Sequence, residues 1–181
     1  AEISFGVDTP CQVEAAQQVF GQAGKIAQVL IEIEVGENRS GIIEESDYIL
    51  LLEQIKNSPN VNFKGIFSHE GHCYGAASLE HCHELFRISQ ERTLHFAKLA
   101  EEMGMKPSVV SIGSTPSLMQ GFELLEGITE LRPGTYSLMD ASMANACNAL
   151  ERCSATILTT VISRPTDERF ITDVGAKGLT A

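Results

Sequence analysis

Residues 107–118 read PSVVSIGSTPSL, a short apolar strand followed by a glycine turn and a helix start. Val109 and Val110 are expected to form a buried strand, and Pro116 suits the first turn of a helix. Four hydroxyl side chains crowd this turn: Ser111, Ser114, Thr115 and Ser117. Backbone N–H groups at a helix start favour an anion, so the segment predicts a phosphate cradle. The alternative is a serine-rich turn with an ordinary helix cap.

The same strand-then-helix pattern repeats along the chain. Strands are expected at 3–7, 26–35, 61–68, 109–112 and 127–131. Helices are expected from Pro10 to the glycines at 21 and 24, at 46–57, at 79–104, and briefly around Leu118 and Met119. The apolar stripe expected on the long helix is Leu85, Ile88, Leu94, Leu99 and Met103. Alternation with a period of roughly 30–40 residues predicts an α/β fold with a parallel sheet.

The pattern changes after Asn148. Residues 155–163 and 169–173 are β-rich, with no helix expected between them. Such a pair predicts an antiparallel hairpin and a second, β-type domain that begins near Ser154.

Composition and charge restrict the class of protein. A net charge of −11 argues against non-specific binding to nucleic acid or to anionic membranes, which needs a basic face. No apolar run approaches the length of a membrane span, and the start AEISFGVD has no features of a signal peptide. Five cysteines without a scaffold pattern favour a reducing cytoplasm.

Two loops expected after strands carry side chains suited to a planar anionic ligand. Arg39 lies in GENRSG, where flanking glycines allow a tight loop that aims the guanidinium inward. The alternative is a solvated loop arginine. His69 and His72 lie in SHEGHCYG, where an imidazole can stack on a ligand or move protons near neutral pH. Alternatively, both histidines only bond the backbone.

A metal is the rival interpretation of this region, because six nitrogen- or sulfur-bearing residues lie close in sequence. They are His69, His72, Cys73, His81, Cys82 and His83. His81 and His83 are two residues apart on an expected helix and so face different ways, and no standard zinc spacing occurs. No metal site is therefore predicted within the chain.

A third loop, RPGTY at 132–136, places a positive charge, a glycine and two hydroxyls at another strand end. It provides a second wall of donors for the same anion, or it is a proline–glycine turn with a partly buried tyrosine. DVGAK at 173–177 is typical of a β-turn with a solvated lysine. No lysine stands out as a nucleophile activated by burial, and no Ser–His–Asp pattern, P-loop or dinucleotide fingerprint occurs.

Five motifs taken in order resemble one family. They are VLIEIEVGENRSGI, GIFSHEGHCYG, SVVSIGSTPS, TELRPGTYSLMD and ITDVGAKGL. The family is that of the pyridoxal-phosphate enzymes with the alanine-racemase-like barrel, in the branch of D-threonine aldolase and D-serine dehydratase. The resemblance implies a (β/α)8 barrel, entered here at about the fourth strand, and then an antiparallel β domain. Residues 1–150 would be part of the cofactor-binding barrel, and residues 151–181 the start of the C-terminal β domain.

The resemblance also implies how the chain holds the phosphate group of pyridoxal phosphate. Ser114 and Thr115 would bind it, and the backbone at Gly134 and Thr135 would help.

The ring of the cofactor would meet residues from the other strand ends. By the same resemblance, Arg39 would approach the pyridine ring, and His69 would lie against the ring or near the reacting carbon. These two are the expected catalytic residues. Arg132 and Tyr136 would complete the wall of the site.

Two parts of the family pattern do not occur in the chain. The family's Schiff-base lysine lies in an Arg-Pro-His-x-Lys-type motif on the first barrel strand, which has no match here. The family's histidine–cysteine metal pair would lie beyond Ala181. We therefore expect an interior piece of a longer protein, inactive by itself, whose complete form holds the lysine and a divalent metal.

The predicted activity of the complete protein is a pyridoxal-phosphate-dependent lyase reaction on a D-amino acid, of aldolase or dehydratase type. A cytoplasmic homodimer is expected. One alternative is an amino-acid racemase of the same fold. Others are a non-catalytic pyridoxal-phosphate-binding protein, against which the β-rich tail argues, and a structural fragment with no ligand.

Overall fold

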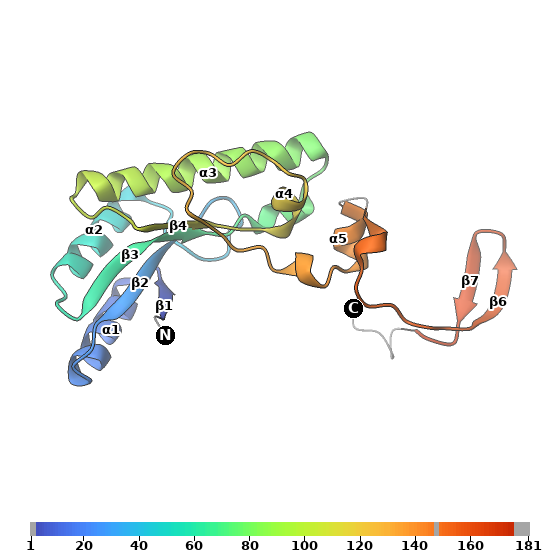
Figure 1. Cartoon of the computed structure of the whole chain (residues 1–181), viewed down its shortest axis with the longest axis horizontal. Coiled ribbons are helices and arrows are strands. Elements are labelled where there is room, and N and C mark those ends of the chain that lie inside the picture. The colour runs from blue at the N-terminus through green and yellow to red at the C-terminus, as the bar shows by residue number, and fades with distance from the viewer. Residues whose placement is uncertain (1–2, 147–148, 176–181) are drawn as a thin grey trace.

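A parallel sheet forms the centre of the protein in the computed structural model, which describes residues 3–146 and 149–175 (Figure 1). Its strands are β1 (Ser4–Val7), β2 (Ala27–Ile33), β3 (Val61–Ser68), β4 (Val109–Ile112) and β5 (Glu130–Leu131). They stand in the order of the sequence, and each neighbouring pair is parallel. All five strands therefore end at the same edge of the sheet.

The helices that connect successive strands lie along one side of the sheet, whereas the helix after its last strand stands apart from it (Figure 1). The α-helices are α1 (Pro10–Gln22), α2 (Glu45–Lys56), α3 (Leu79–Glu102), α4 (Thr115–Met119) and α5 (Ala141–Ala146). Short 3-10 helices are η1 (Gly71–Gly75), η2 (Thr135–Ser137) and η3 (Leu150–Arg152). Strands in sequence order with helices on one side form a sector of a (β/α) barrel, so the predicted α/β fold is confirmed.

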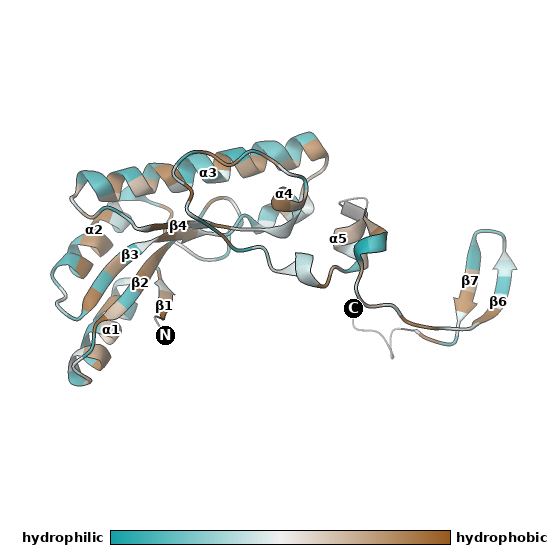
Figure 2. Cartoon of the chain, viewed as in Figure 1, coloured by the Kyte–Doolittle hydropathy of each residue, from teal (hydrophilic) through white to brown (hydrophobic). Residues whose placement is uncertain are grey.

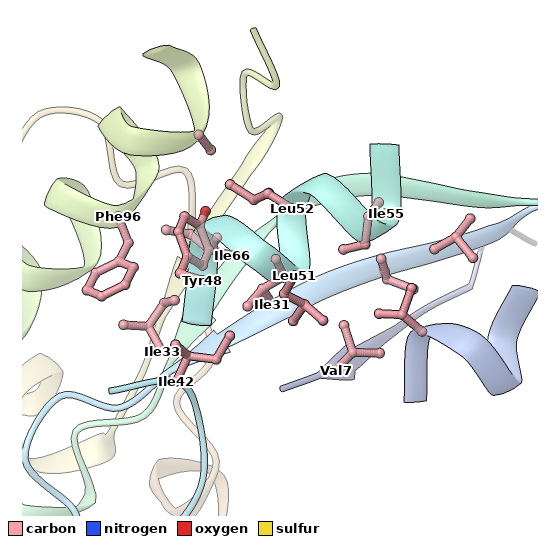
Figure 3. Close-up of a cluster of buried hydrophobic side chains, with 14 of the residues drawn as sticks. Val7, Ile31, Ile33, Ile42, Tyr48, Leu51, Leu52, Ile55, Ile66 and Phe96 are labelled. Carbon is pink, nitrogen blue, oxygen red and sulfur yellow. The ribbon is translucent and has the colours of Figure 1, made fainter. Parts of the chain in front are cut away.

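The core lies between the sheet and these helices. Alternate residues of β2 are buried, and they meet Leu51 and Leu52 of α2 from the other side (Figure 3). The Tyr48 ring meets the edge of the Phe96 ring of α3 with the centroids 5.0 Å apart. The remaining residues of β2 point to the opposite face of the sheet.

Strand bounds agree with the sequence expectation where the apolar pattern is strong. β3 and β4 occupy the predicted residues 61–68 and 109–112. β5 is shorter than the expected 127–131. Gly127 takes a left-handed conformation with φ +104°, which interrupts an extended strand there.

The apolar stripe predicted on α3 is wrong at one position. Ile88 is 43 % exposed, whereas Phe86, Thr93 and Phe96 are fully buried. Thr93 is buried at low cost because its hydroxyl donates to the Ser89 carbonyl over 2.8 Å. Figure 2 shows the alternation of hydrophilic and hydrophobic residues along this helix. The other residues of the predicted stripe pack against the core while partly exposed: Leu85, Leu94, Leu99 and Met103.

The expected antiparallel hairpin is present as β6 (Val161–Thr166) and β7 (Arg169–Thr172), and it stands away from the main sheet (Figure 1). Its first strand begins later than the predicted 155–163. The Asp173 carboxylate accepts hydrogen bonds from the Thr159 hydroxyl at 2.6 Å and the Thr160 N–H at 2.9 Å. Bonds to this side chain therefore hold residues 159 and 160, and the β6–β7 pairing begins only after them. Lys177 of the DVGAK motif lies outside the described residues. Within the described ranges, no helix has the length and apolarity needed to cross a membrane.

Candidate active site

Four loops meet at the carboxyl edge of the sheet, where the strands end. The loop of residues 34–44 follows β2, residues 69–78 follow β3, Gly113 follows β4, and residues 132–134 follow β5. Hydrogen bonds cross between them, joining Glu37 to His69, Glu70 to Gly113 and Tyr74 to Thr135. This is the edge at which (β/α) barrels carry their chemistry.

The predicted ring residues Arg39 and His69 are brought together through a third residue. Glu37 Oε2 accepts a hydrogen bond from His69 Nδ1 at 2.9 Å, and Glu37 Oε1 lies 3.3 Å from Arg39 Nη1. Arg39 Nη2 also lies 3.9 Å from Glu32 Oε1. The Arg39 side chain is 55 % exposed, so ion pairs with carboxylates, and not burial, orient its guanidinium.

The loop that carries Arg39 is held by its own carboxylate and by α3. Glu34 Oε1 accepts from the N–H groups of Gly36 at 2.7 Å and Asn38 at 2.8 Å. From α3, Arg92 Nε donates to the Glu34 carbonyl at 2.7 Å and its Nη2 donates to the Ile43 carbonyl. Both ends of the loop are therefore fixed to one arginine.

Glu70 is a fully buried carboxylic acid at the centre of the edge. Its Oε2 accepts from the Gly113 N–H at 3.3 Å, and its Oε1 has no hydrogen-bond partner among the described residues. Burial raises the pKa of Glu70, and nearby N–H groups, His69 and Arg132 oppose that rise. The acid therefore holds its proton more strongly than a solvated glutamate.

The stability of the wild-type protein is expected to fall as the pH rises, and this fall is expected to be less steep in Glu70→Gln. Because the pKa is raised in the folded state, the folded protein keeps a proton that the unfolded chain releases above the ordinary value of 4.5. The stability that this proton provides is complete below pH 4.5 and is lost as the pH rises through the raised pKa. Urea denaturation of both proteins across this range measures the slope. An equally steep fall in Glu70→Gln would contradict the assignment.

Arg132 reaches across the strand ends. Its Nε donates to the Ser111 hydroxyl at 2.7 Å, its Nη2 donates to the Ser68 carbonyl, and its guanidinium lies over the Phe67 ring at 5.1 Å. Burial lowers the pKa of Arg132, while the carboxylates of Glu70 and others raise it. Its Nη1 has no hydrogen-bond partner in the part of the chain that the structure describes.

The four hydroxyl residues of the predicted phosphate cradle are buried. Ser114 is the N-cap of α4, but its hydroxyl bonds the Ser117 hydroxyl at 2.9 Å and makes no cap bond. The Gly113 N–H already donates to Glu70, so the expectation of free N–H groups is wrong at this residue. Thr115 Oγ1 is buried and, among the described residues, has no hydrogen-bond partner.

The third predicted wall is more open. The Thr135 hydroxyl lies 3.2 Å from the Tyr74 hydroxyl, which joins the loops after β5 and β3. Tyr136 is 52 % exposed, and Gly134 is exposed with open space where a Cβ would lie. The structure therefore places Arg132 and Thr135 in the network of strand ends, while Tyr136 lies at its surface.

Residues of the rival metal interpretation have other structural roles. His81 Nδ1 accepts from the Ala77 N–H at 3.1 Å at the start of α3, and the His83 ring lies 4.7 Å from the Phe122 ring. Within residues 3–146 and 149–175, no three His, Cys, Asp or Glu side chains are grouped in a way that could hold a metal ion.

Sequence reasoning missed two residues of the site: Glu37 and Glu70. Glu37 and Glu70 lie inside the quoted motifs GENRSG and SHEGHCYG. A carboxylate in a polar loop is usually solvated, so nothing in the pattern separates these two from surface glutamates. Their position in the sequence could have indicated them, because Glu37 lies two residues from Arg39 and Glu70 lies next to His69.

Comparisons with known proteins identify the family of the chain and agree with its fold. Residues 1–142 match the family described as Alanine racemase, N-terminal domain. D-threonine aldolase of Arthrobacter sp. is 32% identical over 186 residues, covering 100% of this chain and 48% of that protein. D-threo-3-hydroxyaspartate dehydratase of Delftia sp. (strain HT23) is 30% identical over 178 residues, covering 96% and 46%. The solved structure of the Delftia enzyme matches with a TM-score of 0.81 at 25% identity, covering 91% of this chain and 44% of that one.

The chain therefore belongs to the alanine racemase N-terminal domain family, within the pyridoxal-phosphate enzymes of that barrel fold. It spans about half the length of the curated relatives it matches. The predicted family resemblance is confirmed, and the observed sheet is part of such a barrel.

Proposed function

We propose that the natural-length protein is a pyridoxal-phosphate-dependent lyase acting on a D-amino acid that carries a hydroxyl on its third carbon. The names of the two relatives support this, since threonine and 3-hydroxyaspartate both carry that hydroxyl. Aldolase-type and dehydratase-type cleavage both fall within the proposal. We also propose that the protein is a cytoplasmic homodimer. In its chain, residues 1–150 form part of the barrel and residues 151–181 begin the β domain.

The residues at the carboxyl edge fit the cofactor. Thr115 Oγ1 is the observation that carries this, because a buried hydroxyl without a partner among the described residues is costly unless a ligand bonds it. A phosphate oxygen is a suitable acceptor, and the Arg132 guanidinium provides a positive charge at the neighbouring strand end. Arg39 and His69 lie on the strand ends next along the sheet.

The roles we propose follow from these positions. Ser114 and Thr115, with the backbone at Gly134 and Thr135, bind the phosphate. Arg39 lies at the ring and His69 against it.

The remaining residues give the site its wall. The Arg132 guanidinium donates to Ser111 and Ser68, so its orientation is fixed before a ligand binds. Tyr136 closes the exposed side. When bound, pyridoxal phosphate supplies the electron sink for cleavage at the substrate's α-carbon. The residues of this chain bind that group, orient it and exclude water from its buried side.

The lysine that anchors the cofactor belongs, in this proposal, to a part of the protein outside these 181 residues. Two lysines of the chain support this by their surroundings. Lys98 and Lys106 are more than 70 % exposed, and they pair with Glu102 and Glu101 on α3. Lys98 lies on α3 and Lys106 lies just before β4 begins, so both are away from the carboxyl ends of the strands.

Replacing Thr115 by valine is the test of the proposed function. Valine has nearly the same shape without the hydroxyl, so the cofactor-free protein is expected to be at least as stable as wild type. Binding of pyridoxal phosphate is expected to weaken about 10- to 100-fold. A hydrogen bond to a charged group contributes roughly 1.5–3 kcal/mol, which corresponds to such a change in affinity. Absorbance titration with the cofactor measures the affinity, and urea denaturation measures the stability.

The wild-type reaction is followed in the same samples with D-threonine. Glycine as product defines an aldolase, and ammonia with a 2-oxo acid defines a dehydratase. Wild-type protein that binds no pyridoxal phosphate would overturn the proposal. Thr115→Val with unchanged affinity and lost stability would make Thr115 a core residue only.

A further inference from the structure

We propose that Glu37 is a positioning residue that joins Arg39 and His69 into one unit and makes His69 present Nε2, without a proton, to the site. The inference rests on the proposed function for its catalytic consequence. The geometric part stands on the hydrogen bonds of this chain alone.

The two oxygens of Glu37 have separate tasks. Oε2 meets His69 Nδ1 at 2.9 Å, and Oε1 meets Arg39 Nη1 at 3.3 Å. A carboxylate accepts and does not donate, so the proton of a neutral His69 must be on Nδ1. The lone pair is then on Nε2, which has no partner among the described residues.

The Glu37 carboxylate lies directly against Gly71, at the start of η1. A Cβ built on Gly71 would lie 2.0 Å from Glu37 Oε1. A side chain at this position would therefore displace the carboxylate from the place it occupies between the loops after β2 and β3. The carboxylate thus fills a place that both loops shape, unlike a surface ion pair that forms wherever two side chains meet.

None of the neighbouring acidic side chains takes the place of Glu37 at His69. Glu34 accepts from the N–H groups of Gly36 and Asn38. Glu32 accepts from the Ser40 hydroxyl at 2.9 Å and lies farther from Arg39 than Glu37 does. Glu70 also lies near His69, but its Oε2 accepts from the Gly113 N–H and its Oε1 has no hydrogen-bond partner among the described residues, so neither oxygen bonds the imidazole. Glu37 is therefore the carboxylate that sets the tautomer of His69.

The first experiment observes the imidazole directly, with Glu37→Gln in the natural-length protein. An amide replaces one of the two carboxylate oxygens with an NH2 donor, so it cannot offer an acceptor at both the position facing Arg39 and the position facing His69. Nitrogen NMR of ¹⁵N-histidine protein, at a pH where the imidazole is neutral, identifies the protonated nitrogen, and His69→Asn assigns the signal. We expect the Nδ1–H form in wild type and loss of its predominance in Glu37→Gln. An Nε2–H form in wild type, or an unchanged signal in the variant, would overturn the inference.

The matched control is Glu45→Gln. Glu45 makes the same kind of pair with His95, at 2.7 Å, on the exposed side of α2 and α3. It tests whether losing any glutamate–histidine pair alters the enzyme. We expect turnover to be unchanged in this control.

The second experiment measures turnover in the same variants. Glu37→Gln is expected to lower kcat on the order of 10- to 100-fold, the cost of misplacing a group at the reacting centre, with a smaller change in KM. In a His69→Asn background the further loss should be much smaller, because Glu37 acts through that histidine. Equal losses in both backgrounds would contradict this.

The two proposals fail in distinguishable ways. A wild-type protein without cofactor binding or turnover overturns the proposed function, whereas the NMR result still decides the tautomer. An active wild type whose Glu37→Gln variant keeps its kcat overturns the positioning role alone.

Discussion

Replacing Gly65 by alanine is expected to destabilise the protein by roughly 3 kcal/mol or more, the largest stability effect predicted here. A Cβ at this position would lie 1.9 Å from the Val109 carbonyl oxygen and under 3.0 Å from two more backbone atoms of Val109. These atoms belong to β4, the strand paired with β3, and backbone cannot rotate away as a side chain can. The two strands would have to separate.

The site is expected to fail together with the fold, because the β3–β4 pairing holds Glu70 next to Gly113. Urea denaturation monitored by circular dichroism gives the free energy of unfolding. Gly75→Ala is the matched control, since open space surrounds Gly75, and its effect is expected to stay within about 0.5 kcal/mol. A Gly65→Ala protein as stable as this control would show that the sheet accommodates the methyl group.

Replacing Arg132 by alanine is expected to cost about 3 kcal/mol of stability and to abolish measurable binding of pyridoxal phosphate. The guanidinium donates to Ser68 and Ser111, and hydrogen bonds to charged groups contribute roughly 1.5–3 kcal/mol each. Its loss also leaves the Glu70 and Glu130 carboxyls without the positive charge that faces them. Thermal unfolding and a cofactor titration measure the two effects.

Arg132→Lys separates the two roles of this side chain. Lysine keeps the charge but lacks the planar fork that reaches Ser68 and Ser111 together. We expect it to recover part of the stability and little of the cofactor affinity. Full recovery of both by lysine would show that the charge alone matters at this position.

The fold was largely predictable because strong apolar patterns specify it. β3 packs against α2 and α3 through buried residues such as Val61 and Ile66, and its bounds match the prediction. The face of α3 was harder, because Ser89 and Thr93 are buried there and hydropathy alone does not select them. Their hydroxyls bond carbonyls four residues earlier, a compensation that a sequence pattern does not show.

The site was predictable at the level of strand ends but not of pairings. Arg39, His69 and Arg132 follow predicted strands, so parallel topology alone brings them to one edge. Which carboxylate meets which partner depends on loop conformation, as with Glu37 above Gly71. That conformation depends on single hydrogen bonds between residues far apart in the sequence, for example from the Gly41 N–H to the Asp8 carboxylate.

The attachment of the loop of residues 34–44 to Arg92 has a consequence for the entropy of ligand binding. With its two ends held by one side chain of α3, the loop has lost most of its conformational freedom when the protein folds. Ordering one free backbone residue costs roughly 1–2 kcal/mol, so a loop of this length would be expensive to fix upon binding. Here the cost is met by folding, and a ligand that contacts Arg39 retains the full free energy of that contact.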